Sequence, residues 1–197
     1  MGLTNTSTPL VCLASVSPRR HELLAQIGVP HSVVAADIDE TAMPGEAPRD
    51  YVVRMARQKA LTVRQRGARL PVLAADTTVV LDNTIYGKPR DRDDGVAMLG
   101  RLSGRTHEVL TAVALASSHE VTLRLSVSTV RFRGLTPQEC AAYWDTGEPR
   151  DKAGGYAIQG AAAVFVESLS GSYSGVMGLP LFETAELLRA AGVAYWR

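Results

Sequence analysis

The sequence contains only two cysteines and three lysines among its 197 residues. Cys12 and Cys140 are far apart and lie in apolar stretches, which favours buried thiols in a reducing compartment over a disulfide framework or a metal site. No apolar run approaches the ~18 residues of a membrane span, and the N-terminus lacks the basic and apolar regions of a secretory signal. These features predict a cytoplasmic protein that does not associate with a membrane.

The sequence also lacks an excess of either charge, since its formal net charge is +1. This balance argues against broad electrostatic binding to nucleic acid. The hydrophobic fraction of 46% and the charged fraction of 21% are ordinary for a globular protein that buries a substantial core. Because no repeat, low-complexity tract or linker interrupts the chain, we expect a single domain over residues 1–197.

Apolar runs and helix-start signals alternate along the chain without a strict βαβ rhythm. Strands are expected at 10–14, 32–36, 71–75, 79–81, 84–86, 106–117, 121–133 and 157–168, the last interrupted by Gly160. Helices are expected at 18–27, from 48 to beyond 63, and at 91–102, 136–146 and 179–191. This order predicts an α/β fold with a mixed, partly antiparallel central sheet flanked by helices.

The stretch LASVSPRR, residues 13–20, joins the first strand to the first helix. Ser17 is expected to cap this helix, with Pro18 at its first position. Arg19 and Arg20 then oppose the positive field of the helix N-terminus, a conflict that a bound phosphate would relieve. The alternative is a solvated helix start whose arginines pair with surface carboxylates. Neither a Walker-type loop nor a G-x-G-x-x-G motif is present.

Asp76 follows the apolar run at 71–75 directly, and Thr77 continues the polar step. A carboxylate at the carboxyl end of a buried strand lies where open α/β sheets bind ligands, and it could bind Mg²⁺ or take a proton from water. The alternative is an aspartate that caps a turn. The acidic stretch DIDE at 37–40 could add carboxylates for a divalent cation, although acidic turns are common.

Three further side chains are candidates for binding an anion or a base. Lys88 lies between a glycine and a proline, where it could serve a phosphate as a point charge or extend into solvent. Lys59 lies in an arginine-rich helix, a local pattern that favours a solvent-facing position. Gln159 carries a planar amide that suits the edge of a base, or it is a polar residue on the open face of a strand.

In this order, these stretches resemble the Maf family of nucleotide pyrophosphatases. The matching blocks are LASVSPRR at 13–20, DIDE at 37–40, AADT at 74–77, GKPR at 87–90, LSGRTH at 102–107, 111–113, DKAGGYAIQG at 151–160, and 170–180. They extend from about residue 10 to residue 191. The resemblance implies a two-lobed Maf/ITPase-like fold with the active-site cleft between the lobes.

The resemblance also implies an activity, namely hydrolysis of a nucleoside triphosphate to the monophosphate and pyrophosphate. The divalent cation that it implies, Mg²⁺, Mn²⁺ or Co²⁺, would be held by Glu40 and Asp76. Matched by position, Asp76 is the proton acceptor, Glu40, Lys59 and Lys88 are further catalytic residues, and Ser15 and Arg20 belong to the phosphate-binding turn. Family members are generally dimers, so the resemblance implies a homodimer. The binding partner that it implies is the nucleoside triphosphate substrate.

Three positions separate a dTTP/UTP-cleaving branch of the family from a 7-methyl-GTP-cleaving one. Arg19, Thr77 and Gln159 all match the dTTP/UTP branch, whereas the other branch typically has Trp, Gln and Glu there. Val16 and Ala157 depart from the usual family residues, but neither change removes a chemical group. The alternatives are a pyrophosphatase for 7-methyl-GTP, damaged purine nucleotides or modified pyrimidine nucleotides, and a non-catalytic regulator of cell division.

Overall fold

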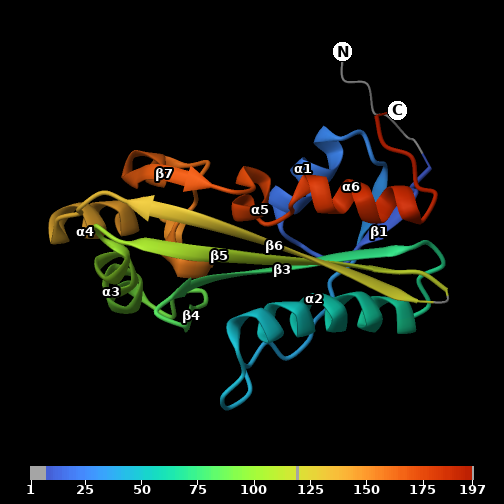
Figure 1. Cartoon of the computed structure of the whole chain (residues 1–197), viewed down its shortest axis with the longest axis horizontal. Helices are drawn as coiled ribbons and strands as arrows, with labels where there is room; N and C mark the ends of the chain where they lie inside the picture. Colours follow the sequence, from blue (N-terminus) through green and yellow to red (C-terminus); the bar gives the residue numbers. More distant parts are fainter. Residues whose placement is uncertain (1–7, 119, 197) are drawn as a thin grey trace.

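The computed structural model describes residues 8–118 and 120–196, and its centre is a seven-stranded sheet (Figure 1). The strands are β1 (Val11–Leu13), β2 (His31–Val33), β3 (Val72–Leu81), β4 (Thr84–Tyr86), β5 (Thr106–Ala116), β6 (Val121–Phe132) and β7 (Val166–Ser170). Their order is β2-β1-β3-β5-β6-β7, with β4 also paired to β3. β2, β1 and β3 are parallel, whereas all other pairs are antiparallel. The predicted mixed, partly antiparallel sheet is therefore confirmed.

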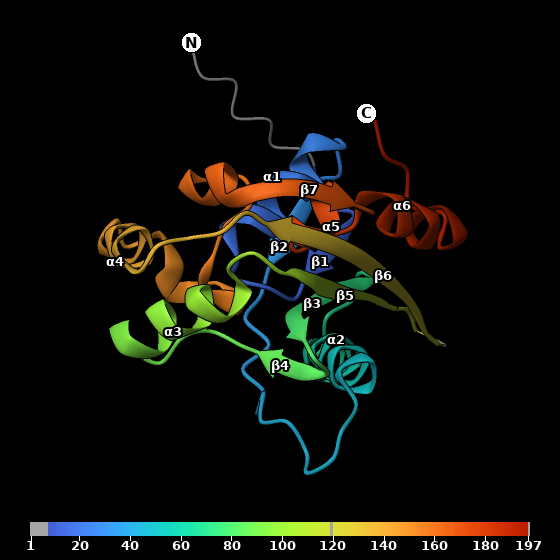
Figure 2. The same ribbon diagram turned by 60° about the vertical axis from the view of Figure 1, so that its left-hand side comes forward.

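Helices cover both faces of the sheet. They are α1 (Pro18–Gln26), α2 (Pro48–Gln65), α3 (Arg92–Leu102), α4 (Pro137–Asp145), α5 (Tyr173–Met177) and α6 (Leu181–Ala190), with 3₁₀ turns at Glu148–Asp151, Ala153–Gly155 and Ala161–Phe165. Figures 1 and 2 show α2 on one side of the long strands and α1 and α6 on the other, while α3 and α4 lie near the opposite end. Within the described ranges, no helix is long and apolar enough to cross a membrane.

In the described residues the core forms three clusters, all of which include the long strands β3 and β5, while two also include β6; these strands have 10, 11 and 12 residues. One cluster packs α2 against a row of small side chains that includes Ala74 and Ala112, which allows the helix to approach the sheet closely. The second packs α1 and α6 against the opposite face. The third surrounds Phe132 at the far end, together with α3 and α4. The middle of β3, between these clusters, holds the polar residues discussed below.

The prediction that the strand at 71–75 ends on Asp76 is wrong. β3 continues unbroken to Leu81, and its register with β5 runs without a bulge from Val72 to Val80. The polar residues do not end the strand because two of them are threonines, which favour extended backbone, and because Asp76 has a buried cationic partner. Asp76 therefore lies in the middle of a strand instead of at its carboxyl end.

The expected strand 157–168 is also wrong, because only Val166–Ser170 is extended. Residues 161–165 form a 3₁₀ turn, and the N–H of Ala161 donates to the Glu148 carboxylate at 3.1 Å. A Cβ on Gly160 would lie 2.1 Å from that carboxylate, so the glycine permits a close approach here instead of interrupting a strand. Gln159 consequently lies in a turn, and it is not on a strand face as expected.

Candidate active site

A cleft of about 720 Å³ opens beside the middle of β3, within the size range of small-molecule sites. It forms because β3 loses a neighbour on one side: β1 pairs with it only as far as Leu73, and β4 joins only at Val79. Between these points, β5 is the one strand of the described chain that pairs with residues 74–78. Helix α1 begins at Pro18, just beyond the end of β1, and its first turn lines the cleft.

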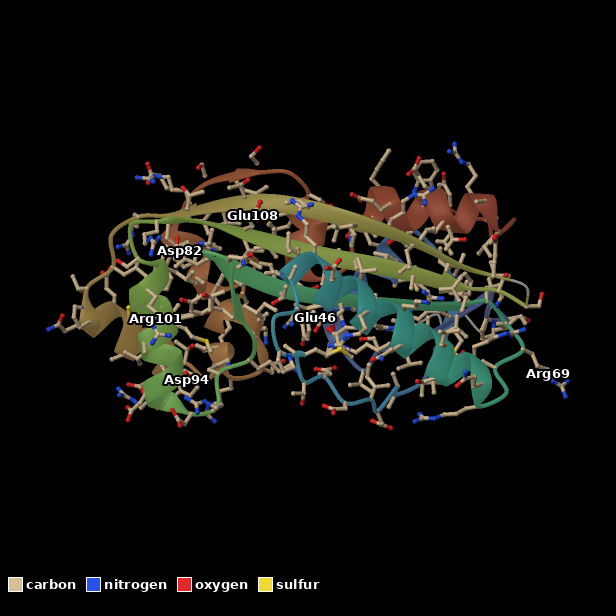
Figure 3. All side chains as sticks on the ribbon, turned by 60° about the horizontal axis from the view of Figure 1, so that its bottom comes forward. Glu46, Arg69, Asp82, Asp94, Arg101 and Glu108 are labelled. Carbon is tan, nitrogen blue, oxygen red and sulfur yellow. The ribbon has the colours of Figure 1, made fainter. Side chains whose placement is uncertain are left out.

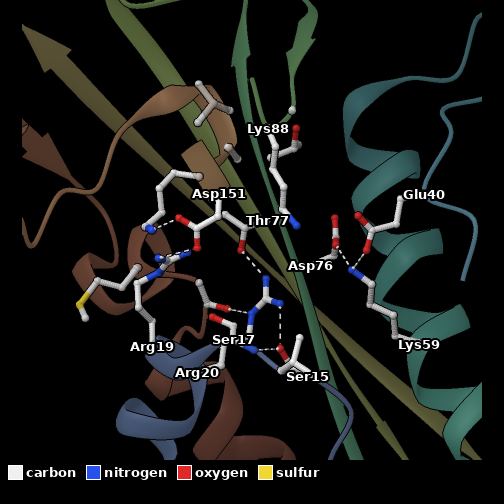
Figure 4. A pocket seen from close by; sticks show the side chains of 18 of the residues that line it. Ser15, Ser17, Arg19, Arg20, Glu40, Lys59, Asp76, Thr77, Lys88 and Asp151 are labelled. Atoms are coloured by element: carbon white, nitrogen blue, oxygen red, sulfur yellow. Dashed lines mark hydrogen bonds and ion pairs between the residues drawn. The ribbon is translucent and has the colours of Figure 1, made fainter. Parts of the chain in front are cut away.

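Lys59 joins the two candidate carboxylates on one side of the cleft (Figure 4). Its Nζ lies 2.6 Å from Asp76 Oδ1 and 2.6 Å from Glu40 Oε1. The lysine is only 8% exposed, on the face of α2 that also buries Met55 and Ala56, so the solvent-facing position favoured by the local pattern is wrong. The candidate residues Asp76 and Glu40 are thus joined through their common contact with Lys59.

The two carboxylates differ in acidity although they share one lysine. Burial raises the pKa of Asp76, and the positive charges of Lys59 and Arg20 offset this effect only in part. Burial also acts to raise the pKa of Glu40, but the hydrogen bond and charge of Lys59, with smaller effects of Lys88 and Arg20, outweigh it and lower the pKa. A pair of carboxyl groups whose pKa values are pushed apart is suited to divided roles. Asp76 is the better proton acceptor, and Glu40 is the one that stays ionised.

Tyr51, which the sequence reasoning did not single out as a site residue, lines the same side of the cleft. Burial, followed by the charges of Asp76 and Glu40, raises its pKa to about 12. Its hydroxyl therefore stays protonated, and it donates to the backbone carbonyl of Glu40 at 3.0 Å. Tyr51 thus fixes the backbone of the loop that presents Glu40.

A second contact ties this loop to α2. Arg54 donates from Nε and Nη2 to the carboxylate of Glu46, at 2.5 and 2.6 Å, and from Nη2 to the carbonyl of Thr41 at 3.1 Å. Figure 3 shows Glu46 beside the beginning of α2. A two-point arginine–carboxylate contact restricts orientation as well as distance. The loop before α2 is therefore held at both Tyr51 and Arg54.

Arg20 is the centre of the second polar group, on the other side of the cleft. It donates from Nε to the carbonyl of Gly178 at 2.7 Å, from Nη1 to Ser15 Oγ at 3.3 Å, and from Nη2 to Thr77 Oγ1 at 3.2 Å. A guanidinium has five N–H bonds, so two are left for a ligand once these three contacts are made. The predicted phosphate-binding residues Ser15 and Arg20 are thus in contact, and Thr77 joins them.

Arg19 and Ser17 differ from Arg20 in how they are held. Arg19 makes a single ion pair, 3.9 Å from Asp151 Oδ2, at the edge of the cleft (Figure 4). Ser17 stands at the N-cap of α1 as predicted, but its side chain accepts no hydrogen bond from the helix. Its own N–H donates to Ser15 Oγ at 3.2 Å. The first turn of α1 therefore begins without a side-chain cap from Ser17, and this leaves its N–H groups available to an anion.

Lys88 and Gln159 line the same cleft from the loop after β4 and from the turn before residue 161. Figure 4 shows the Lys88 side chain directed into the cleft between Thr77 and Asp76. Gln159 is exposed and lies in the turn that is closed by the hydrogen bond from the N–H of Gly160 to the carbonyl of Ala157, at 3.0 Å. The structure therefore brings all nine candidate residues to one cleft, in two contacting groups with Arg19, Lys88 and Gln159 at its borders.

The two candidate metal ligands fit a hard divalent cation. Glu40 and Asp76 each give one oxygen to Lys59 and keep a second carboxylate oxygen beside the cleft. Mg²⁺ is commonly held by one or two carboxylates together with substrate phosphates and water. Among the residues that the structure describes, no group of three or more His, Cys, Asp or Glu side chains could hold a metal alone. The donor set suits a cation that arrives with a phosphate ligand.

His107 and Tyr156 support the far wall of the cleft, and sequence reasoning gave neither a role. His107 Nε2 lies 2.8 Å from the hydroxyl of Tyr156, and Tyr156 lines the cleft. His107 is 2% exposed, and burial lowers its pKa to about 4. A neutral His107 therefore positions the Tyr156 side chain, and with it the start of the segment that ends at Gln159.

This buried histidine predicts a pH dependence of stability. Because the pKa of His107 is about 4 in the folded protein and ~6.5 in the unfolded chain, the unfolded chain binds the proton first as the pH falls. The resulting loss of stability grows from pH ~6.5 down to pH ~4 and is absent above this window. Between pH 7 and 5, the wild type should lose about 2 kcal/mol more unfolding free energy than His107→Gln. Urea unfolding at both pH values measures this, and equal losses would contradict it.

Comparison with known proteins gives a consistent family match. The family model described as "Maf-like protein" matches residues 10–191. The dTTP/UTP pyrophosphatase of Saccharophagus degradans is 53% identical over 189 residues, covering 94% of this chain and 90% of that protein. The dTTP/UTP pyrophosphatase of Alkalilimnicola ehrlichii is 55% identical over 195 residues, covering 96% of each. That of Nitrosomonas europaea is 52% identical over 197 residues, covering 93% and 95%.

Among solved structures, the Ham1 protein of Staphylococcus aureus aligns with a TM-score of 0.41 and 11% identity, covering 62% of this chain and 71% of that one. This similarity is too low to establish a common fold.

Proposed function

The chain belongs to the Maf family, and from that premise we propose that it hydrolyses dTTP and UTP to the nucleoside monophosphate and pyrophosphate. The observation that carries the proposal is the meeting, in one cleft, of a carboxylate pair on Lys59 and an arginine-containing turn at a helix N-terminus. The first group suits activation of water, and the second suits a chain of phosphates. The names of the relatives support the choice of dTTP and UTP.

The proposed reaction begins with the binding of the triphosphate by Arg20, Ser15 and Lys88. Asp76 then accepts the proton of a water molecule whose oxygen attacks the α-phosphorus. The new P–O bond forms as the bond from the α-phosphorus to the bridging oxygen breaks, and pyrophosphate leaves with the electron pair. Arg20 and Lys88 stabilise the negative charge that develops on the leaving group. The raised pKa of Asp76 supports its role as the base.

We propose that Glu40 and Asp76 hold a divalent cation, Mg²⁺, Mn²⁺ or Co²⁺. Such a cation would supply charge neutralisation on the phosphate oxygens. Lys59 keeps the two carboxylates together and oriented toward the cleft, because it contacts both at 2.6 Å.

The base is proposed to lie toward Arg19, Thr77 and Gln159. The amide of Gln159 can pair with the O4 and N3–H groups that thymine and uracil share. A single 5-methyl group changes the binding free energy in a pocket by only about 1–3 kcal/mol, so one site can accept both bases. We further propose that the chain acts as one domain with two lobes around this cleft, as a homodimer in the cytoplasm.

A substrate panel tests the proposed base choice. Pyrophosphate release is measured with dTTP, UTP, CTP and 7-methyl-GTP, each with Mg²⁺, Mn²⁺ or Co²⁺ and after chelation. We expect the highest kcat/KM with dTTP and UTP, and no turnover after chelation. A preference for 7-methyl-GTP would contradict the assignment to the dTTP/UTP branch. Absence of metal-dependent pyrophosphate release from every nucleotide would instead favour a regulator without catalysis.

A further inference from the structure

A closed ring of polar contacts surrounds Arg20, and it includes Thr111 on β5, a residue not yet given a role. Thr111 lies directly opposite Thr77 in the register of β3 and β5. The two hydroxyl oxygens are 3.1 Å apart, and Thr111 donates to the carbonyl of Gly175 at 2.7 Å. Arg20 closes the ring, because it contacts Thr77 through Nη2 and Gly178 through Nε.

The direction of the hydrogen bonds in this ring follows from the donors present. Arg20 has only donors, so the hydroxyl oxygen of Thr77 accepts from it. Thr111 is the donor in both of its contacts, to the carbonyl of Gly175 and to Thr77 Oγ1, and it divides its single hydroxyl proton between them. The Thr77 oxygen therefore accepts from both Arg20 and Thr111.

The segment that receives both ends of the ring is itself anchored. Ser172 caps α5 by accepting the N–H of Gly175 at 3.0 Å, and its own N–H donates to Ser128 Oγ on β6 at 2.9 Å. Gly178 has a φ of +119°, and a Cβ there would lie 3.4 Å from Arg20 Nε. The positive φ favours glycine at this position. Arg20 is therefore tied to this segment directly at Gly178 and indirectly, through Thr77 and Thr111, at Gly175.

We propose that Thr111 is a positioning residue for the proposed reaction: acting through Thr77, it holds the Arg20 guanidinium in the orientation that directs its two remaining N–H bonds at the substrate phosphates. Thr111 is 1% exposed and, unlike Thr77, does not line the cleft. Its effect on the reaction is therefore indirect. The inference rests on the proposed function, because the substrate phosphates are the ligand that Arg20 binds.

Replacing Thr111 by valine tests this inference, since valine keeps the shape and removes the hydroxyl. We expect Thr111→Val to lower kcat for pyrophosphate release from dTTP about tenfold, with a smaller change in KM. Thr111→Ser should restore kcat to within about twofold, because the hydroxyl returns. In an Arg20→Lys background, Thr111→Val should cause no further loss of kcat, because the guanidinium through which Thr111 acts on the substrate is already absent.

A matched control is available on α6. Thr184 is fully buried, and in the described part of the chain its hydroxyl has no hydrogen-bond partner. Thr184→Val should therefore keep the turnover of the wild type and should not lower the melting temperature. Thr111→Val with wild-type kcat, or with the same fractional loss in the Arg20→Lys background, would overturn the proposal.

A second readout does not depend on turnover. The Nε–H of Arg20, identified in ¹H–¹⁵N spectra by its absence from Arg20→Lys, should exchange slowly with solvent because it donates to Gly178. We expect faster exchange in Thr111→Val and wild-type exchange in Thr111→Ser and Thr184→Val. Unchanged exchange in Thr111→Val would overturn the proposal. A wild type that releases no pyrophosphate would overturn the proposed function, and the exchange rates would still decide whether Thr111 positions Arg20.

Discussion

Asp76→Asn is expected to reduce the turnover of dTTP about a thousandfold, the loss typical when a general base is removed. Asparagine has nearly the same shape as aspartate and can still accept a hydrogen bond from Lys59, but it cannot take the proton of the attacking water. The fold should survive, because the aspartate is 6% exposed and burial already disfavours its charged form. Steady-state kinetics together with a melting curve measure both effects.

An aspartate at the surface provides the control for this substitution. Asp145 is exposed, and its carboxylate lies 3.4 Å from Arg92 in a surface ion pair, a kind of contact that contributes little to stability. Asp145→Asn should therefore retain wild-type kinetics. Full turnover in Asp76→Asn would show that another group accepts the proton.

The adjacent arginines predict two different kinds of loss. Arg20→Ala removes a guanidinium that contacts Ser15, Thr77 and Gly178, and it should lower kcat/KM about a hundredfold for every triphosphate. Within the described chain Arg19 makes one ion pair, at 3.9 Å from Asp151, a long contact that leaves its guanidinium able to reach the variable part of the substrate. Arg19→Trp should alter the ranking of substrates, raising 7-methyl-GTP relative to dTTP, with a smaller overall loss.

Both variants are measured with the same four nucleotides as the wild type. Arg92→Ala, on the surface and paired with the exposed Asp145, is the control and should leave both rate and ranking unchanged. A change of ranking in Arg20→Ala, or equal losses on all substrates in Arg19→Trp, would contradict the division between the two arginines.

Features set by neighbouring residues could be predicted from the sequence. The helices expected at 18–27, 91–102 and 136–146 are observed, and each begins at a local signal: Pro18, the Asp91 side chain, or the capping box of Thr136 with Glu139. The strands expected at 79–81 and 84–86 are likewise extended, and the two residues between them adopt positive φ.

Two sequence signals conflict at Lys59: its helical spacing indicates a buried face, whereas the arginine-rich composition around it indicates a solvated one. The lysine follows Met55 and Ala56 at helical spacing and precedes Val63 by four residues, so it shares the buried face of α2. The many arginines of this helix favoured a solvated position instead. Helical spacing was the better guide, because it identifies the face and composition does not.

Contacts between distant segments could not be predicted from one sequence. Arg20 and Gly178 are separated by 158 positions, and their contact depends on how α1 and α5 pack together. The continuation of β3 through Asp76 likewise depends on pairing with β5. In this pairing Thr77 lies opposite Thr111, which is 34 positions later in the sequence. The resemblance to the family identified several of these residues, but it did not show which of them touch.

The proposed reaction cleaves the bond between the α- and β-phosphates of dTTP in this cleft. The most direct measurement is a ³¹P NMR time course of the wild-type protein with dTTP and Mg²⁺. We expect dTMP and pyrophosphate to appear in equal amounts while dTTP disappears. Formation of dTDP and orthophosphate, or no loss of dTTP, would contradict it.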